Sequence, residues 1–321
     1  MESKNTILAK LTGGKRRNLR SLGLLAFIGA LWLACALLSP YFFQKSNIML
    51  LLRQCSTIMI GGTGMTFVLL TAGTDLSVGS IAALSGMMAG IAITNWSWPA
   101  PAALLLGLAI GLAFGCFNGF LISRFKLQPM VCTLGSSSIA KGLTLLSTSG
   151  RSIFVTNGLM IRIGNGYVLE FPIPVLIAFV IFAIAYVILN YTLLGRHLYS
   201  IGGNEEATRL SGINTQRVKT VAYAVSGFCA AAVGLILVCT LGASEPTVGA
   251  DLALDSIAVS AIGGVSLSGG VGSLVGTILG AILIGTIKNG LTMLNIVSYY
   301  QQLILGFVII FAVLLEQIKK K

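Results

Sequence analysis

The chain is 321 residues long, and its composition excludes an ordinary soluble domain. Hydrophobic residues make up 55% of it and charged residues only 9%, whereas soluble domains carry roughly 25% charged residues. The formal net charge is +12, but the cations cluster at the ends of apolar runs, which is typical of membrane topology signals rather than of nucleic-acid binding. We therefore expect a membrane protein whose partner is the lipid bilayer and not a nucleic acid.

Apolar runs of helical length follow one another along almost the whole chain. A bilayer core of about 30 Å takes about 20 residues of helix, so the sequence predicts an all-α polytopic protein with about ten transmembrane helices. The predicted spans are 19–38, 48–72, 76–95, 102–123, 129–148, 172–190, 220–241, 251–267, 272–294 and 297–315. They form one transmembrane domain over 19–315, between tails at 1–18 and 316–321. The second and eighth spans have the least defined boundaries, and central glycines leave open a break in the second.

The positive charges predict which way the chain crosses the membrane. With the N-terminus in the cytoplasm, fifteen of the 21 Lys and Arg residues fall in cytoplasmic segments and four in external ones, while Lys141 and Lys288 lie inside spans. This asymmetry follows the positive-inside rule. It places both termini and the loop 191–219 in the cytoplasm.

The loop 191–219 is the only long, richly charged stretch between predicted spans. The residues from Glu205 onward favour a short helix, with Asn204 at the N-cap position and Glu205 and Glu206 in the first turn, where the helix dipole favours acids. Gly212 is suited to end it. A short polar helix between two spans lies in water, and we interpret this one as the place where a soluble motor grips a membrane channel.

A faint internal repeat relates the two halves of the chain. GTDLSVGSIA from Gly73 and GADLALDSIA from Gly249 match at six of ten places, and Asn118 and Asn289 are each followed by glycine. An odd number of predicted spans separates the copies, so they face opposite sides of the membrane. We interpret this as an inverted 5+5 pseudo-repeat, which recurs in transport proteins; chance similarity between glycine-rich segments is the alternative.

Few ionisable groups lie inside the predicted spans. Asp75 and Asp251 each precede a span, where a carboxylate either caps the helix or serves function, and capping is the preferred interpretation. Asp255 lies deeper in its span and is harder to explain as a cap. For Lys288, lining a polar pathway and snorkelling to the interface are equally good interpretations.

Glycines recur every fourth residue in several spans. In the fourth span they are Gly107, Gly111, Gly115 and Gly119, and the same spacing relates Gly86 to Gly90 and Gly276 to Gly280. Glycines so spaced share a helix face and let another helix approach closely. Packing within the chain is the preferred interpretation, and a contact with a second copy is the alternative.

No string in the chain forms a nucleotide-binding loop. GSSSIAKG from Gly135 resembles a phosphate loop, but Ala140 replaces its second glycine, Gly142 replaces its magnesium-binding hydroxyl, and the string lies in an apolar span. If ATP is used, another chain binds it. A secondary transporter usually needs intramembrane carboxylates or histidines, and their scarcity here favours an energy source outside the membrane.

Four strings together resemble the permease subunit of ribose-type ABC sugar importers, a likeness that extends over nearly the whole chain. They are GMTFVLLTAGTDLSVGSIAALSG from Gly64, GRHLYSIGGNEEATRLSGIN from Gly195, AIGGVSLSGGVGSLVGTILGA from Ala261 and NGLTMLNIVSYYQQLILG from Asn289. The resemblance implies the type II ABC importer permease fold in the bacterial inner membrane. It also implies a tandem-domain ABC ATPase that binds ATP and magnesium, a periplasmic sugar-binding protein, and a second permease copy, identical or related.

In that family the segment matching 202–213 is the cytoplasmic coupling helix, seated in a cleft of the ATPase. The residues so implicated are Gly202, Gly203, Asn204, Glu205, Glu206, Ala207, Thr208, Arg209, Leu210, Ser211 and Gly212. The groups we expect to line the sugar pathway are Thr66, Asp75, Ser77, Ser80, Asn118 and Asn289. We expect no catalytic residue, metal or cofactor in this chain. An ion-coupled secondary sugar transporter is the alternative function.

Overall fold

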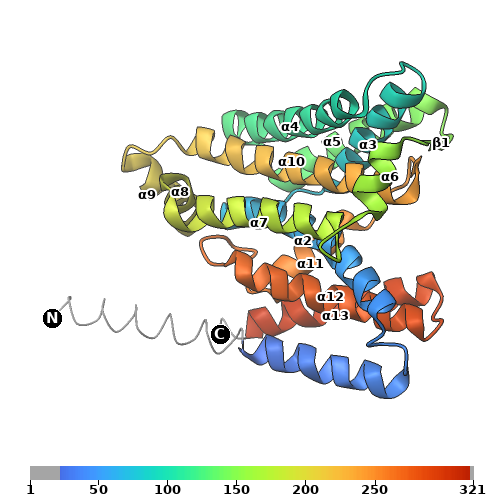
Figure 1. The fold of residues 1–321 in the computed structure, drawn as a ribbon. Coiled ribbons are helices and arrows are strands. Elements are labelled where there is room, and N and C mark those ends of the chain that lie inside the picture. The colour runs from blue at the N-terminus through green and yellow to red at the C-terminus, as the bar shows by residue number, and fades with distance from the viewer. Residues whose placement is uncertain (1–21, 319–321) are drawn as a thin grey trace.

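The structure is a computed structural model that describes residues 22–318, and nearly all of its elements are helices (Figure 1). The N-terminal half contains a helix over Leu22–Leu38, then α2 (Lys45–Leu70), α3 (Val78–Thr94), α4 (Ala100–Phe125) and α5 (Pro129–Thr148). The middle contains α6 (Gly158–Asn165), α7 (Ile173–Tyr191), α8 (Leu193–Gly203) and α9 (Glu205–Leu210). The C-terminal part contains α10 (Thr215–Leu241), α11 (Leu252–Ile262), α12 (Leu274–Met293) and α13 (Ser298–Ile318). The predicted N-terminal tail, 1–18, lies outside the described residues.

Helices of membrane-spanning length and composition confirm the prediction of a helical membrane protein. Within residues 22–318, five helices are long and apolar enough to cross a bilayer: α2, α4, α7, α10 and α12. Three further apolar helices are shorter, Leu22–Leu38, α3 and α11. These helices are identified as possible spans by their length and composition alone.

The structure fixes the two spans whose boundaries the sequence defines least. α2 is one continuous helix and has no break at its central glycines, because those glycines make room for neighbours: a side chain on Gly61 or Gly62 would collide with α11, and one on Gly64 with Cys229. The eighth predicted span shrinks to the 11 residues of α11. The fifth, by contrast, coincides with α5 at both ends.

α10 lies at the centre of the bundle, packed against α4, α3 and α2. The glycine stripe of α4 makes one of these contacts. Side chains on Gly111, Gly115 and Gly119 would collide with the backbone of α10, at Gly227, Tyr223 and Thr220. These glycines are therefore packing positions within the chain, as preferred above, and the alternative contact with a second copy is wrong for this stripe, because α10 occupies it.

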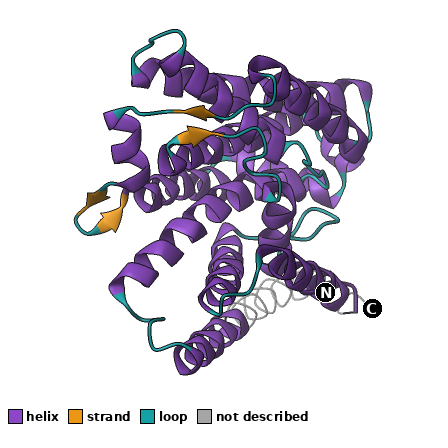
Figure 2. Cartoon of the chain, turned by 90° about the vertical axis from the view of Figure 1, so that its right-hand side faces the viewer, coloured by secondary structure: helices purple, strands orange, loops and turns teal. Residues whose placement is uncertain are grey.

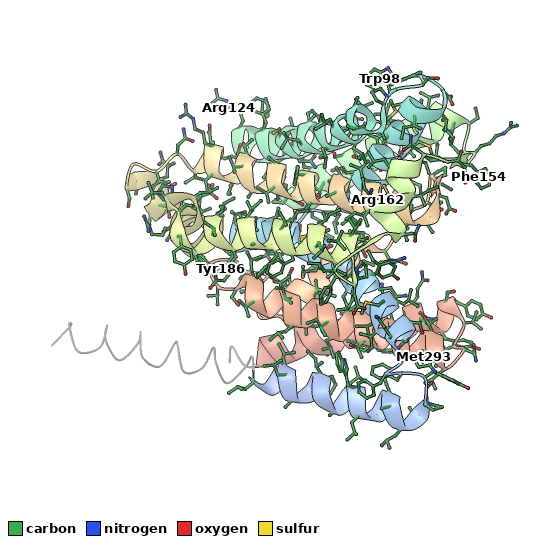
Figure 3. All side chains as sticks on the ribbon, in the orientation of Figure 1. Trp98, Arg124, Phe154, Arg162, Tyr186 and Met293 are labelled. Atoms are coloured by element: carbon green, nitrogen blue, oxygen red, sulfur yellow. The ribbon has the colours of Figure 1, made fainter. Side chains whose placement is uncertain are left out.

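Two short strand pairs lie at one end of the bundle (Figure 2). β1 (Ile153–Phe154) pairs antiparallel with β4 (Ala243–Ser244), with Ile153 opposite Ser244. β2 (Tyr167–Val168) and β3 (Phe171–Pro172) form a hairpin. We call this the β1 end; Trp98, Phe154 and Arg162 lie there, and Arg124 lies at the opposite end with α8 and α9, which we call the α9 end (Figures 1 and 3).

Candidate functional site

α9 is a short, capped and largely exposed helix between two longer ones. The Asn204 side-chain oxygen accepts the N–H of Ala207 at 2.9 Å, which confirms the predicted N-cap. At the other end the N–H of Gly212 donates to Arg209 O and that of Ile213 to Thr208 O, and Gly212 has a φ of +84°. This arrangement is a Schellman motif, so Gly212 ends the helix as predicted, one residue after the cap residue Ser211.

Ion pairs fix the charged side chains of α9. Arg209 donates to both carboxylate oxygens of Glu206, at 2.6 and 3.1 Å. This hydrogen-bonded pairing holds the pKa of Glu206 below its ordinary value and raises that of Arg209. Glu205 pairs instead with Lys219 on α10, and so ties α9 to the start of a membrane helix.

The C-terminus of α8 is seated on two membrane segments at the α9 end. A side chain on Gly202 would collide with the carbonyl oxygen of Leu70, which is the last residue of α2. It would also collide with the backbone nitrogen of Gly270, in the loop before α12. Gly270 itself donates that N–H to Leu70 O at 3.1 Å. Three backbones therefore meet here without side chains between them.

The outer surface of this helix pair is free among the described residues. Leu210 is 74% exposed, and within α9 only Thr208 is buried. The predicted residues 202–212 thus span the end of α8, the extended Asn204, α9 and its C-terminal turn. They present an apolar side chain and paired charges away from the bundle.

Asp75 lies in a buried polar cluster where the chain passes from α2 to α3. Its carboxylate accepts the N–H of Ser77 at 3.0 Å, the hydroxyl of Ser77, and the hydroxyl of Ser226 on α10 at 2.7 Å. The amide of Asn118 on α4 donates to Ser77 Oγ at 2.9 Å. The preferred interpretation of Asp75 as a helix cap is therefore incomplete: α3 begins at Val78, and the carboxylate also bonds across to α10.

The remaining predicted pathway residues lie apart from this cluster. Thr66 bonds Thr277 at 2.8 Å and Ser80 faces Ser137 at 2.8 Å. Asn289 exchanges hydrogen bonds with Asn47 at 2.9 and 3.2 Å. The structure brings Asp75, Ser77 and Asn118 together, and it does not gather all six around one cavity.

Asp255 and Asp251 both have partners on other helices. Lys288 forms an ion pair with Asp255, a partner that neither interpretation of Lys288 had included, and the pair joins α12 to α11. Asp251 precedes α11 but makes no capping hydrogen bond. It accepts instead from the amide of Gln302 at 3.2 Å, so the preferred capping role of Asp251 is wrong.

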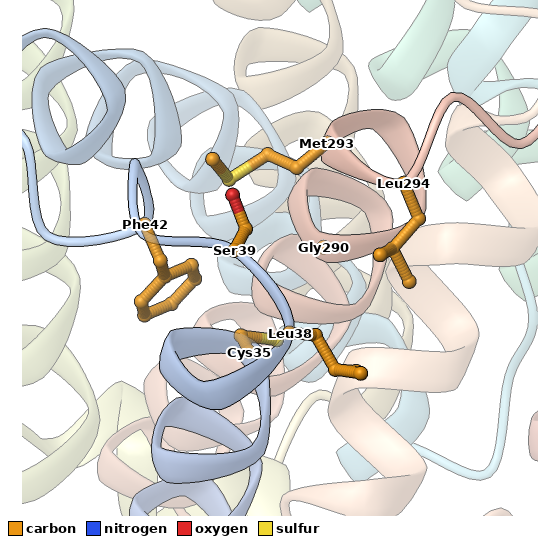
Figure 4. Close-up of a pocket in the computed structure, with 7 residues that line it drawn as sticks. All are labelled: Cys35, Leu38, Ser39, Phe42, Gly290, Met293 and Leu294. Carbon is orange, nitrogen blue, oxygen red and sulfur yellow. The ribbon is translucent and has the colours of Figure 1, made fainter.

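Two of the hollows formed by the described residues differ greatly in size. One has a volume of about 10 Å³ between the helix Leu22–Leu38 and the end of α12, where Cys35, Phe42 and Met293 line it (Figure 4). A single water molecule needs about 10–15 Å³, so a sugar does not fit there. The other measures about 420 Å³ and lies at the β1 end, between the start of α2 and the β2–β3 hairpin.

Sequence reasoning missed several partners of the predicted residues. Ser226 on α10, Thr133 on α5 and Asn47 on α2 hydrogen-bond the polar groups described above or the backbone beside them. Single serines, threonines and asparagines in apolar helices carry no spacing signal. Only the packing of distant helices shows which of them meet.

Comparison with known proteins agrees with this architecture. The model of the family described as "Branched-chain amino acid transport system / permease component" matches residues 47–313. The chain is 42% identical over 285 residues to the ribose import permease protein RbsC of Haemophilus influenzae, and the match covers 88% of both chains. It is 41% identical to RbsC of Bacillus subtilis over 88% of both chains. It is 35% identical to the D-allose transport system permease protein AlsC of Escherichia coli, over 88% of this chain and 87% of that one. The chain therefore belongs to this family of membrane transport permease components.

Proposed function

We propose that this chain is the membrane permease of an ATP-binding cassette importer and that it forms the passage for a monosaccharide such as ribose. The observation that carries the proposal is the seating of α8 and α9. A water-exposed helix pair bears directly on the end of α2 and on the loop before α12, which is the geometry needed to turn an external push into a tilt of membrane helices.

Ten membrane crossings and an inverted repeat are part of this proposal. In the proposed repeat, α2, α3 and α4 correspond to α10, α11 and α12. The packing supports this correspondence, because each contact in one half has an equivalent in the other. The contact of α4 with α10 is matched by that of α12 with α2, and the contact of α3 with α10 is matched by that of α11 with α2. The two matched sequences also touch. A side chain on Gly79, in the first copy, would collide with the carbonyl oxygen of Gly249, in the second.

We place the α9 end in the cytoplasm of a bacterium and the β1 end outside. Six described cations lie on or beside α8, α9 and the adjoining ends of α4 and α10: Arg124, Lys126, Arg196, Arg209, Arg217 and Lys219. Lys45, Arg53, Arg151 and Arg162 lie toward the other end, and Lys141 and Lys288 lie within α5 and α12. Such an imbalance orients a chain in the inner membrane with its positive end inside. Both termini then lie in the cytoplasm.

The proposed partners are a tandem-domain ATPase against α9, a periplasmic sugar-binding protein at the β1 end, and a second permease copy. The surface of α5 supports the second copy. α5 is not among the five apolar spans, and its exposed residues include Ser138 and Lys141, which are three residues apart and share a helix face. Polar side chains facing lipid are costly, so we assign this face to a wet passage shared with another permease.

In the proposed cycle the ATPase binds ATP and magnesium, and this chain supplies the conformational response. Movement of α8 and α9 displaces α2 through Gly202 and Leu70. The Asp75 cluster lies directly beyond the end of α2, and its hydrogen bonds to α3, α4 and α10 then exchange partners. A neutral sugar needs only transient polar contacts, since tight binding would slow its release.

Uptake by proteoliposomes that contain the permease with its ATPase and binding protein tests the coupling role. We expect Glu205→Lys, which places a cation beside Lys219, and Gly203→Pro, which disrupts the last turn of α8, to abolish ATP-driven uptake while both proteins still insert. The matched controls are Glu245→Lys, an exposed acid at the β1 end, and Gly203→Ala, whose added carbon has nothing within 4 Å. Normal transport by Glu205→Lys and Gly203→Pro would refute the coupling role.

The same vesicles decide between this function and an ion-coupled secondary transporter. A secondary transporter keeps its uptake when an ion gradient is supplied and the ATPase is left out. An importer permease loses it. Ion-driven uptake without the ATPase would therefore overturn the proposal.

A further inference from the structure

The hollow of about 420 Å³ at the β1 end is unlike the other hollow in size and in lining. Lys45, Ser46 and Met49 of α2 form one wall, and Tyr167 and Glu170 of the β2–β3 hairpin form the other. Pockets that hold small molecules measure about 300–1,000 Å³. This hollow is therefore large enough for a monosaccharide, and it lies at the end opposite α9.

Contacts between the hairpin and α2 hold the two walls in place. Lys45 Nζ and Glu170 Oε1 form an ion pair at 2.9 Å. Below it, Arg53 lies 5.6 Å from the centre of the Tyr167 ring and donates to Asn165 at 2.9 Å and to the Tyr167 hydroxyl at 3.3 Å. The contacts with Arg53 thus hold the Tyr167 ring in position at the edge of the hollow.

The polar groups around the hollow include both donors and acceptors. Glu170 offers carboxylate oxygens and Lys45 an ammonium group, and both side chains are more than two-thirds exposed, at 76% and 68%. The Ser46 hydroxyl is exposed and can both donate and accept a hydrogen bond. The N-cap residue of α2, Gln44, makes no side-chain cap, so the first N–H groups of α2 are further donors.

This combination suits a polyhydroxylated ring. Each sugar hydroxyl is both a donor and an acceptor, and charged partners make the stronger hydrogen bonds. The C–H groups on the face of a sugar carry partial positive charge, which the negative face of an aromatic ring attracts. Few groups and an open rim give weak binding, and a transport pathway needs binding that is weak enough for release.

We propose that Lys45, Ser46, Met49, Tyr167 and Glu170 form an outer subsite that binds a neutral monosaccharide weakly before it enters the membrane passage. The subsite deepens the proposed function and rests on it, since it takes the sugar from the external side. Tyr167 stacks on the sugar ring, and the Lys45–Glu170 pair opens to hydrogen-bond its hydroxyls. A docking surface for the binding protein is the competing use of this face.

The first test measures binding directly. Saturation-transfer NMR with D-ribose on the permease–ATPase complex, without binding protein, is expected to give a signal that Tyr167→Ala and Glu170→Gln each weaken about five-fold. Tyr167→Phe, which keeps the ring, retains the signal. The matched controls at the same end are Tyr300→Ala and Glu245→Gln, both exposed and outside the hollow. Equal signals in the Tyr167→Ala, Glu170→Gln and control proteins would overturn the subsite.

The second test measures uptake at saturating sugar-loaded binding protein. We expect Tyr167→Ala to lower uptake about five-fold while the affinity for the binding protein stays within about two-fold of the wild type. A loss of binding-protein affinity that matches the loss of uptake would make this face a docking surface and overturn the subsite. If the wild type shows no ATP-dependent uptake, the proposed function fails, and the NMR comparison still decides the subsite.

Discussion

At the scale of single residues, buried polar groups are the most constrained part of this molecule. Asp75 is fully buried, and three donors from Ser77 and Ser226 converge on its carboxylate. Asp251 is exposed and accepts one hydrogen bond from Gln302. The two acids occupy equivalent places in the repeated sequence, yet their surroundings differ, and so should the consequences of replacing them.

We expect Asp75→Ala to lower the free energy of unfolding by about 1–3 kcal/mol, because it leaves buried donors without an acceptor. Asp75→Asn keeps one acceptor oxygen and should cost less. Asp251→Ala is the control, expected to stay within about 0.5 kcal/mol of the wild type. Thermal unfolding in detergent measures all three, and equal stabilities for Asp75→Ala and Asp251→Ala would contradict the importance of the cluster.

At the scale of elements, contacts between helices depend on glycines that have no room for a side chain. Gly115 of α4 lies against the backbone of α10 at Tyr223 and Ala224, whereas Gly142 of α5 has nothing within 4 Å of an added carbon. Helix propensity favours alanine over glycine by about 1 kcal/mol at either site. Packing decides which of the two sites benefits from that gain.

We expect Gly115→Ala to destabilise the protein, because separating α4 from α10 costs about 1–3 kcal/mol and exceeds the gain in propensity. Gly142→Ala should be neutral or stabilising. Unfolding temperatures of the two variants provide the measurement. A stabilised Gly115→Ala protein would show that α4 and α10 do not pack as described.

The charges of α9 give a prediction for pH. Arg209 holds the pKa of Glu206 below its ordinary value of 4.5, so the pairing stabilises α9 above pH 4.5 and is lost as the pH falls through the lowered pKa. We expect Glu206 to titrate below 4.5 in the wild type and closer to 4.5 in Arg209→Gln. Carboxyl carbon NMR during an acid titration measures both. Identical titrations would mean that the pair does not form in solution.

At the scale of the whole molecule, the two ends of the bundle differ in structure and in charge. The α9 end carries six of the twelve described Lys and Arg residues and the helix pair seated on α2, while the β1 end carries the strand pairs and the larger hollow. The proposed function requires the first end to face the cytoplasm and the second to face the outside.

Thiol labelling tests this orientation. In a protein whose native cysteines are replaced, we expect an impermeant maleimide added to intact cells to modify Leu169→Cys at the hairpin tip, which is 88% exposed. Ser211→Cys, exposed beside α9, should react only after the membrane is opened. Labelling of Ser211→Cys in intact cells would reverse the topology and end the coupling proposal.

The sequence by itself determined the class, most helix positions and the local form of α9. The predicted bounds of α5 match the structure at both ends, and the helix begins at Pro129, a residue suited to a first turn. The cap of Asn204 and the termination at Gly212 are local hydrogen-bonding patterns, and they too can be read from neighbouring residues. The glycines of α4 were likewise assigned to packing correctly, because their spacing reports a close helix contact.

Only the tertiary structure decided which distant polar groups meet. Ser226 donates a hydrogen bond to Asp75, and Lys288 forms an ion pair with Asp255. The backbone of Leu70 contacts that of Gly202. It also decided that α2 runs unbroken through its glycines. Such partners are far apart in the chain, and in a uniformly apolar background no periodicity marks them. Their meeting is fixed by how the helices pack, which is a property of the whole bundle rather than of any one segment.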